Sequence, residues 1–173
     1  MTEPVHLRPV TANDRQEFLD LMQASRHLHE PWIYPPLSNA LYKHYLKRAN
    51  RDDHVGLLVV ESSTDAIAGV ININNIVRGS FLSGSLGYYA GAPFAGRGYM
   101  TAGMRLVIRH AFKTLGLHRL EANIQPGNES SLALVKRCGF MHEGFSPRYL
   151  FIDGEWRDHE RWTIIDKRRG LVV

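Results

Sequence analysis

The stretch 86-LGYYAGAPFAGRGYMTAGMRLVIRHAFKTLG-116 reads as a strand, a glycine-rich turn and a long helix. Residues 86–90 are apolar and aromatic, which is typical of a buried strand. Turn-forming residues crowd the positions that follow: Gly91, Pro93, Gly96 and Gly98. From Tyr99 onward apolar residues recur at helical spacing, and Gly116 predicts where the helix stops. The rest of the fold is predicted outward from this unit.

The turn before the helix has the features of an anion site. Glycines let the backbone approach a ligand closely, and the first amides of a helix have no partner inside it. These amides and the helix dipole favour a phosphate group. The Walker pattern is absent, and the dinucleotide pattern fails because residue 101 is Thr, although Glu121 lies at a spacing suited to a ribose contact. A tight strand–helix connection without a ligand is the structural alternative.

The composition is that of an ordinary globular chain with a mild basic excess. The length of 173 residues predicts one domain over residues 1–173. A net charge of +4 without a Lys/Arg block suits an anionic ligand and does not indicate a nucleic-acid partner. The one cysteine, Cys138, excludes an internal disulfide and favours a reducing compartment. With no signal peptide and no apolar run of membrane length, the sequence predicts a cytoplasmic protein without a membrane partner.

The order of the predicted elements indicates a mixed α/β sheet with helices on both faces. In the first half, short polar turns between strands predict an antiparallel meander. In the second half, helices between strands predict crossover connections with parallel pairing. The predicted elements are a strand at 5–10, a helix from 14, a helix at 39–50, strands at 54–62, 67–77 and 86–90, a helix at 98–115, a strand at 118–125, and a helix from 128 followed by strands.

The turn resembles a known coenzyme loop. Residues 95–101, AGRGYMT, are similar to the pyrophosphate loop of the GNAT N-acetyltransferases, and within that superfamily to the ribosomal-protein alanine acetyltransferases of the RimJ/RimL type. Ala95 stands where Gln or Arg is usual, and Met100 stands where a small residue is usual. Both positions act mainly through backbone amides, so these departures weaken the match only modestly.

Two further stretches carry the same resemblance. The second signature of the family is met by Asn128, Ser131, Leu134, Gly139, Phe140, Glu143 and Gly144. Residues 148–159 resemble the closing hairpin, with an Asp-Gly turn and the pair Asp158 and His159. The resemblance thus covers nearly the whole chain.

The resemblance implies a fold and an activity. The fold is a GNAT-like three-layer structure with a mixed, mostly antiparallel sheet of about seven strands, splayed where acetyl-CoA binds. The activity is direct transfer of an acetyl group from acetyl-CoA to a primary amine, in the first place a protein N-terminal α-amino group of the ribosomal-protein alanine type, with a small-molecule amine as the alternative acceptor. The resemblance is compatible with a homodimer and implies no metal ion. A non-catalytic CoA- or nucleotide-binding module remains the alternative from another class.

The coenzyme contacts follow from the same resemblance. The pyrophosphate would be held by backbone amides of the turn, with charge added by Arg97. The pantetheine arm would bond to the strand before the turn, and an amide near Tyr89 would polarise the thioester carbonyl. The predicted coenzyme-binding residues are Tyr88, Tyr89, Ala90, Gly96, Arg97, Gly98, Tyr99, Met100, Thr101, Asn128 and Ser131.

Three residues are candidates for proton transfer. Glu121, in an otherwise apolar strand, could accept the amine proton through a water, or could instead form a salt bridge with Arg119. Ser131 matches the family serine near the coenzyme sulfur and could protonate the leaving thiolate, or could be a first-turn helix serine. Tyr149 is a second candidate acid.

The acceptor side is less constrained by the sequence. Residues 25–37, rich in proline and aromatic residues, are predicted to be irregular and to help form the acceptor pocket through Trp32 and Tyr34; an aromatic plug over the core is the alternative. His27 and His29 are interpreted as surface histidines, because no further metal ligand has suitable spacing. Cys138 is interpreted as a core residue and not as a nucleophile.

Overall fold

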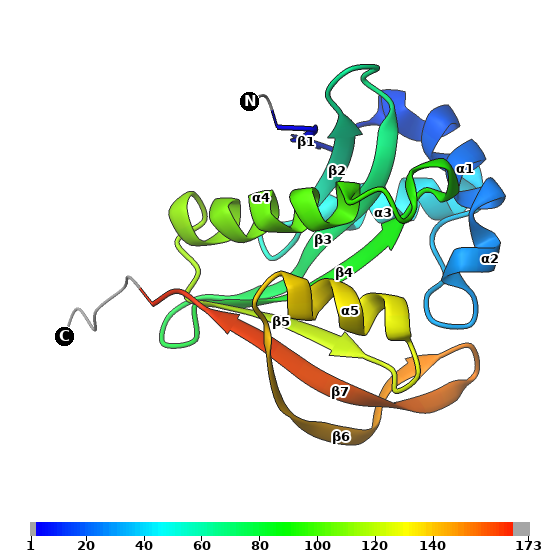
Figure 1. Ribbon diagram of the computed structural model, residues 1–173. Coiled ribbons are helices and arrows are strands. Elements are labelled where there is room, and N and C mark those ends of the chain that lie inside the picture. Colours follow the sequence, from blue (N-terminus) through cyan, green and yellow to red (C-terminus); the bar gives the residue numbers. More distant parts are fainter. Residues whose placement is uncertain (1–2, 168–173) are drawn as a thin grey trace.

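The computed structural model describes residues 3–167 and places a seven-stranded sheet at their centre. The strand order is β1-β2-β3-β4-β5-β7-β6, and β4 and β5 form the parallel pair in an otherwise antiparallel sheet. Figure 1 shows α4 and α5 on one side of the sheet and α1, α2 and α3 on the other. The predicted mixed sheet with helices on both faces is confirmed.

The elements lie close to where the sequence predicts them. The strands are β1 (Val5–Pro9), β2 (Val55–Glu61), β3 (Ile67–Val77), β4 (Ser83–Ala90), β5 (Arg119–Ile124), β6 (Met141–Ile152) and β7 (Glu155–Ile165). The α-helices are α1 (Arg15–Ala24), α2 (Arg26–His29), α3 (Asn39–Ala49), α4 (Tyr99–Lys113) and α5 (Glu129–Arg137). Two 3-10 turns, η1 (Ala12–Asp14) and η2 (Ala92–Phe94), precede α1 and the glycine turn.

Two expectations about the elements are wrong. The segment 25–37 is not wholly irregular, because α2 forms one short helical turn within it. The second crossover does not produce an adjacent parallel pair: β7 lies between β5 and β6 and is antiparallel to both. The tight Asp153-Gly154 turn brings β7 back along β6, and β7 then takes the free edge of β5.

Each face of the sheet has its own apolar core. On one face, α4 and α5 bury residues such as Met104, Val107 and Val135 against the sheet. On the other face, α1 and α3 bury Phe18 and Tyr42. Because side chains alternate along a strand, β4 sends Leu86 to the first core and Tyr89 to the second. This alternation decides which strand residues can face a coenzyme and which can face an acceptor.

One glycine lets α4 lie close to the sheet. A Cβ built on Gly103 would lie 2.7 Å from a methyl carbon of Val59 on β2, so no larger residue fits without movement. The contact fixes the height of the first turns of α4 above the sheet and, with it, the position of the glycine turn that precedes the helix. Among residues 3–167 no helix is long and apolar enough to cross a membrane.

Candidate active site

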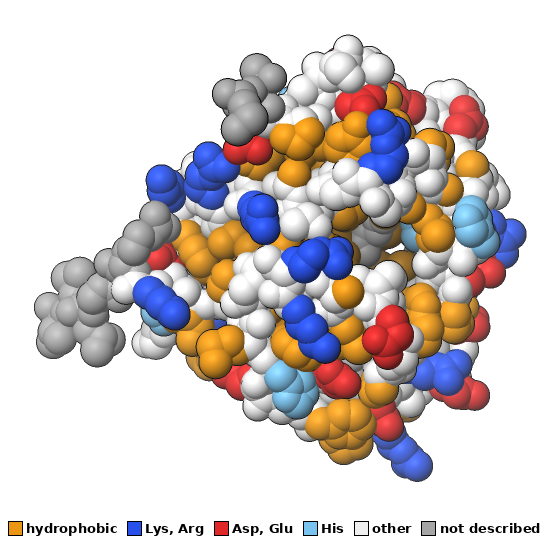
Figure 2. Space-filling view, viewed as in Figure 1, with side chains coloured by type: hydrophobic (Ala, Val, Ile, Leu, Met, Phe, Trp, Pro, Cys, Tyr) orange, Lys and Arg blue, Asp and Glu red, His pale blue; other side chains and the backbone are white. Residues whose placement is uncertain are grey.

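A cavity of about 1470 Å³ lies where β4 and β5 separate. One end is lined by the glycine turn and the start of α5, and the other end by the segment 28–34 and the β6–β7 hairpin. Figure 2 shows Lys and Arg side chains distributed over the α4–α5 side of the molecule around a hollow. The predicted site residues in the lining are Trp32, Tyr34, Tyr88, Tyr89, Ala90, Gly96, Gly98, Met100, Thr101, Glu121, Asn128, Ser131 and Tyr149.

The glycine turn leaves open space in front of the first amides of α4. Gly98 is the N-cap residue of α4 with a φ of 82°, and Gly96 has a φ of 72°. Both angles lie in the left-handed region that other residues rarely adopt. A Cβ built on either glycine would meet no heavy atom within 4 Å. The backbone therefore has both the conformation and the open space that the binding of an anionic group requires.

Two predicted loop residues point elsewhere. Arg97 stacks on the ring of Tyr99, with its guanidinium carbon 5.0 Å from the ring centroid, and donates a hydrogen bond of 3.1 Å to the Tyr99 hydroxyl. That hydroxyl donates in turn to Glu61 on β2. Neither side chain is among the lining residues. The Arg97 amide donates to the Phe94 carbonyl at 3.4 Å, so of these two residues only Tyr99 has a backbone amide left for a ligand.

The strands β4 and β5 pair only at the start of β4. Their parallel register runs from Ser83 opposite Arg119 to Leu86 opposite Ala122, and residues 87–90 extend beyond the last pair. On its other edge β4 stays paired with β3 as far as Ala90. The backbone of residues 87–90 is thus held by β3 while its opposite edge faces the cavity. This geometry is the splay expected from the sequence.

The register corrects which amides face that gap. Gly91 N donates to Ala68 O, and Val70 stands opposite Tyr89. Hydrogen-bonded and non-hydrogen-bonded pairs alternate in an antiparallel ladder, so the amide and carbonyl of Tyr89 point toward β3. The backbone groups of Tyr88 and Ala90 point to the cavity. The amide available for the thioester carbonyl is therefore one next to Tyr89 and not the amide of Tyr89 itself.

The interpretation of His29 as a surface residue is wrong. His29 is 3% exposed, and its Nε2 lies 2.8 Å from the Ala90 carbonyl oxygen. Because a carbonyl only accepts, Nε2 carries the proton. Burial lowers the pKa of His29 below the ordinary value for histidine, so the ring is neutral near pH 7. The hydrogen bond from His29 therefore connects α2 to the end of β4. A second hydrogen bond connects the same segments, because the Ser25 hydroxyl accepts from the Ala92 amide at 2.8 Å.

Ser131 meets a partner from the facing strand. Its Oγ lies 2.6 Å from the hydroxyl of Tyr88. Asn128 caps α5 by accepting from the Ser131 amide at 3.3 Å, which fixes the first turn of the helix. Burial raises the pKa of Tyr88 to about 12, so its hydroxyl stays protonated. Ser131 and Tyr88 therefore form a neutral hydroxyl pair at the α5 side of the splay.

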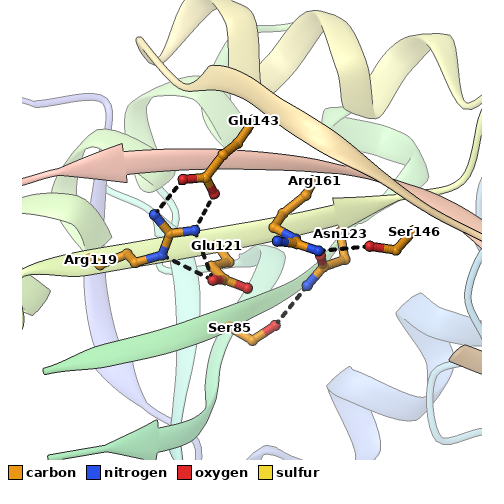
Figure 3. A network of polar contacts seen from close by, with 7 residues as sticks. All are labelled: Ser85, Arg119, Glu121, Asn123, Glu143, Ser146 and Arg161. Atoms are coloured by element: carbon orange, nitrogen blue, oxygen red, sulfur yellow. Dashed lines mark hydrogen bonds and ion pairs between the residues drawn. The ribbon is translucent and has the colours of Figure 1, made fainter. Parts of the chain in front are cut away.

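Glu121 lies in a charged network on the face of the sheet that is turned away from α4 and α5 (Figure 3). Its Oε1 accepts from Arg119 Nε at 2.9 Å, and Arg119 also donates through Nη1 to Glu143 at 3.0 Å. The hydrogen bond from Arg119 lowers the pKa of Glu143 below its ordinary value. The network joins β5 to β6 across β7, and it is the salt bridge that the sequence offered as the alternative role of Glu121.

A second polar group continues along the same face (Figure 3). Asn123 Nδ2 lies 3.5 Å from Ser85 Oγ on β4, and Arg161 Nη2 donates to Ser146 Oγ at 2.8 Å. Asn123 Oδ1 is buried and has no hydrogen-bond partner among the described residues. The face of the sheet at the cavity is therefore polar, in contrast to the apolar face under α4.

The segment 25–37 closes the acceptor end of the cavity by contacts with three elements. His29 binds β4, as described above, and the Trp32 carbonyl accepts from Gln125 Nε2 just past β5 at 3.0 Å. The Tyr34 hydroxyl donates to Asp153 Oδ2 in the hairpin turn at 2.9 Å. The predicted acceptor residues Trp32 and Tyr34 thus lie in a strap, residues 25–37, that spans the opening between the separated strands.

The hairpin brings Tyr149 against a buried histidine. The ring of Tyr149 lies 6.1 Å from the ring of His159 in an edge-to-face arrangement. Asp158 Oδ1 accepts from the Arg148 amide at 2.8 Å, and the register of β6 shifts between Ser146 and Leu150. Asp158 therefore stabilises a bulge that turns Tyr149 toward His159.

Two other points of side-chain chemistry concern metal ligands and Cys138. Within residues 3–167 no group of three or more His, Cys, Asp or Glu residues is arranged to hold a metal ion. Cys138 is half-buried against the α4–α5 core, its Sγ lies 3.9 Å from the Thr101 carbonyl, and burial raises the pKa of its thiol. A thiol with a raised pKa is a poor nucleophile near neutral pH.

For three residues of the site, the sequence did not indicate a role of the side chain. Tyr88 was expected to act through its backbone, yet its hydroxyl meets Ser131. His29 and His159 were given no role, and both are buried in the cavity wall. The signal that could have found His159 is the Asp158-His159 pair, which stood out as a motif without an assigned function.

Comparison with known proteins places the chain among acetyltransferases. It matches the family model of the acetyltransferase (GNAT) domain over residues 5–141. It is 34% identical over 169 residues to the ribosomal protein uS5-alanine N-acetyltransferase of Escherichia coli (strain K12), covering 91% of this chain and 86% of that protein. It is 28% identical over 170 residues to the probable N-acetyltransferase YjcK of Bacillus subtilis (strain 168), covering 94% of each.

Solved structures show the same fold. Mycobacterium smegmatis RimJ in complex with CoA-disulfide superposes with a TM-score of 0.84 at 28% identity, over 93% of this chain and 81% of that one. Spermidine N-acetyltransferase from Vibrio cholerae, in complex with CoA and spermine, gives a TM-score of 0.77 at 20% identity, over 95% of this chain and 96% of that one. At that lower identity the likeness extends to the fold alone.

Proposed function

Since the chain belongs to the GNAT acetyltransferase family and is an acetyl-CoA-dependent N-acetyltransferase, we propose that its acceptor is the α-amino group of a protein N-terminus, as in its RimJ-type relatives. Membership in the family removes the alternative of a non-catalytic binding module. A small-molecule amine, such as the spermidine used by a relative of lower identity, is the competing acceptor.

The charge of the cavity lining carries this proposal. Its acidic residues are Glu121 and Asp153, and each already has a partner, Arg119 or Tyr34. Arginines are also present in the lining, at Arg48, Arg51 and Arg137. A polyamine brings several ammonium groups that need carboxylates, because a buried charge without a counter-charge is costly. A peptide N-terminus brings one ammonium and a neutral backbone, which this lining accommodates better.

The coenzyme end fits acetyl-CoA. The open turn at Gly96 and Gly98 and the first amides of α4 are suited to the pyrophosphate, and the cavity-facing backbone of Tyr88 and Ala90 to the pantetheine arm. α4 contains Arg and Lys residues and no acidic residue, which adds to the attraction for an anion. Acetyl-CoA supplies the activated acetyl group, and the chain supplies positioning and charge stabilisation.

The order of the amides along β4 supports a role for each of them. The arm would extend from the glycine turn into the splay, so its thioester end would lie deepest, near the last β4–β5 pair. The first cavity-facing amide beyond that pair is that of Tyr88, which would then be the donor for the developing oxyanion. Ser131, held by Tyr88, would donate to the departing thiolate, whose ordinary pKa is ~8.5.

The amine must also lose a proton before it can attack. An α-amino group has a pKa of ~8, against ~10.4 for lysine, so an N-terminus needs only a modest base near neutral pH. Glu121 stays a candidate for this base, although its ion pair with Arg119 supports a structural role. Tyr149 stays a second candidate acid on the acceptor side.

A panel of acceptors tests the proposal. Thiol release from acetyl-CoA would be measured with a peptide that has a free N-terminal alanine, the same peptide with a blocked N-terminus and an internal lysine, and spermidine. The free-alanine peptide should give a kcat/KM at least ~10-fold above the others, because its amine is the most readily deprotonated. The blocked peptide is the matched control for peptide binding without the α-amine. A preference for spermidine or for the lysine would contradict the proposed acceptor.

A further inference from the structure

We propose that His159 is the general base of this enzyme, and that its Nε2 takes the proton from the incoming ammonium group. The inference rests on the proposed function only in needing an amine acceptor. It assigns a role to the Asp158-His159 pair that the sequence and the family comparison leave without one.

The hydrogen bonds of His159 fix its tautomer. Nδ1 lies 2.9 Å from the carbonyl oxygen of Arg157, two residues earlier on the same strand. A carbonyl oxygen can only accept, so Nδ1 carries the proton of the neutral ring. The lone pair of the imidazole therefore lies on Nε2, as in other histidines that are oriented for proton transfer by a bond to their second nitrogen.

Nε2 is the part of the ring that reaches the cavity. The side chain is 2% exposed, and His159 is among the lining residues. The buried unpaired side-chain atoms among the described residues are His29 Nδ1 and Asn123 Oδ1, and Nε2 of His159 is not one of them. Since Nε2 makes no hydrogen bond within the described chain, it must contact the open space. The nitrogen that can accept a proton is thus the one a ligand in the cavity can reach.

The sheet places His159 on the acceptor face. Trp162 stands opposite Ala122, and both belong to the core under α4 and α5. Alternation along β7 puts His159 on the other face, together with Arg161. The strap of residues 25–37 covers this face, so a base there approaches the amine from the side opposite Ser131.

The register also places His159 level with the reacting end of the coenzyme. The β5–β7 ladder ends with Ile124 opposite Glu160, and His159 follows directly. Extending the β4–β5 register by two residues puts Tyr88 level with Ile124. Glu121, in contrast, lies level with Ser85, about 10 Å back along β4 from Tyr88 at ~3.3 Å per residue. Along the strand direction His159 therefore lies nearer to Tyr88 than Glu121 does, although β5 separates β7 from β4 in the sheet.

The surroundings keep the ring neutral and in place. Burial lowers the pKa of His159, and the bond to the Arg157 carbonyl and the charge of Asp158 oppose that shift in part. Tyr149 and Ser146 face it from β6, and Arg161 reaches Ser146 from β7. Glu121 is held by Arg119, whereas no such cation binds His159 within the described residues.

The proton balance of the step is complete. The ammonium N–H bond breaks, its proton passes to Nε2 and the electron pair stays on nitrogen. That pair forms the C–N bond with the thioester carbon, and the C–S bond then breaks with its electrons moving to sulfur. The nitrogen loses its second proton as the amide forms, and this proton reaches the thiolate by way of Ser131, whose hydroxyl donates its own proton to sulfur and regains one from the nitrogen. The imidazolium returns its proton to solvent.

The first test compares pH–rate profiles of H159Q, E121Q and H110Q, using the best acceptor of the wild-type enzyme. His110 lies on α4 outside the cavity lining and is the matched control for loss of a histidine. H159Q should lose about 100-fold in kcat near pH 7, within the usual range for a general base, with the affinity for acetyl-CoA unchanged. It should recover toward wild type above about pH 9, where the α-amine is already free. H110Q should follow the wild-type profile.

Other profiles would overturn the proposal. A uniform loss in H159Q at every pH would indicate a structural role, and a recovery at high pH confined to E121Q would assign the base to Glu121. Nitrogen NMR tests the tautomer of His159 without any acceptor, and the signals of this ring are identified by their absence in H159Q. Protonation of Nε2 instead of Nδ1 in the neutral ring would contradict the inference. A failure of the proposed acceptor would appear instead as a wild-type preference for another amine.

Discussion

At the scale of single residues, the backbone angles of the glycine turn matter more than its side chains. Gly96 and Gly98 both have positive φ, and the space in front of them is open. A ligand that binds through backbone amides requires this arrangement, because any side chain would occupy the space that the phosphates need. The departures from the family pattern at Ala95 and Met100 leave this geometry intact.

Gly98→Glu should abolish binding of acetyl-CoA in a protein that still folds. The new carboxylate would project into the open space with a charge like that of the pyrophosphate. The left-handed backbone angle costs about 1–2 kcal/mol for a non-glycine residue. Isothermal calorimetry would measure the affinity. Gly139→Glu is the matched control, since Gly139 has a similar φ of 86° and equally open space, but follows α5. Unchanged affinity in folded Gly98→Glu would refute the assignment of the loop.

At the scale of elements, α5 links a capping residue to a candidate catalytic residue. Asn128 accepts from the Ser131 amide, so the cap that starts the helix also positions the hydroxyl that meets Tyr88. α3 has an equivalent cap, in which Ser38 accepts from the Leu41 amide at 3.3 Å, but it lies away from the cavity lining. The two caps are a natural pair for separating stability from catalysis.

Asn128→Ala and Ser38→Ala should each lower the free energy of unfolding by about 1 kcal/mol, the usual cost of a lost cap. Only Asn128→Ala should also reduce kcat, by about 10-fold or more, because the first turn of α5 would no longer hold Ser131 in place. Urea unfolding and steady-state kinetics on both variants would measure the two effects. Equal kcat values in the two variants would mean that the cap of α5 has no part in catalysis.

At the scale of the whole molecule, buried histidines couple stability to pH. Burial lowers the pKa of His29 and His159, so each takes up a proton less readily in the folded state than in the unfolded state. Below the ordinary value of about 6.5 the unfolded chain therefore binds more protons. Their contribution to stability is fully present above that pH and is lost as the pH falls toward the folded values. Paired carboxylates such as Asp14, whose pKa is lowered in the folded state, lose their contribution to stability at lower pH, below about pH 4.

The melting temperature should accordingly be level from about pH 8 to 7 and should fall as the pH drops below about 6.5. His29→Gln should flatten part of that fall, because glutamine cannot take up the proton but can still donate to the Ala90 carbonyl. His44→Gln, on the exposed side of α3, is the control and should leave the slope as it is. Thermal unfolding followed across this pH range would measure the effect. An equal slope in His29→Gln and wild type would show that His29 does not contribute.

The sequence by itself determined the elements other than α2, the glycine turn and the family. Helix spacing after Tyr99, the caps at Ser38 and Asn128 and the Asp153-Gly154 turn are local features, set by residues a few positions apart, so they can be predicted without knowing the fold. The family signatures are local in the same sense. The prediction of one domain over residues 1–173 and the roles of the site residues stay predictions.

Only the tertiary structure decided which distant residues meet. The insertion of β7 between β5 and β6, the burial of His29 against Ala90, and the contact of Tyr88 with Ser131 each join segments far apart in the chain. The direction of the Tyr88 amide and the tautomer of His159 depend in turn on strand register and on one carbonyl. A one-residue shift of register would turn each of these groups to the other edge or face. Local sequence patterns do not encode that register, and the chemistry of the site depends on it.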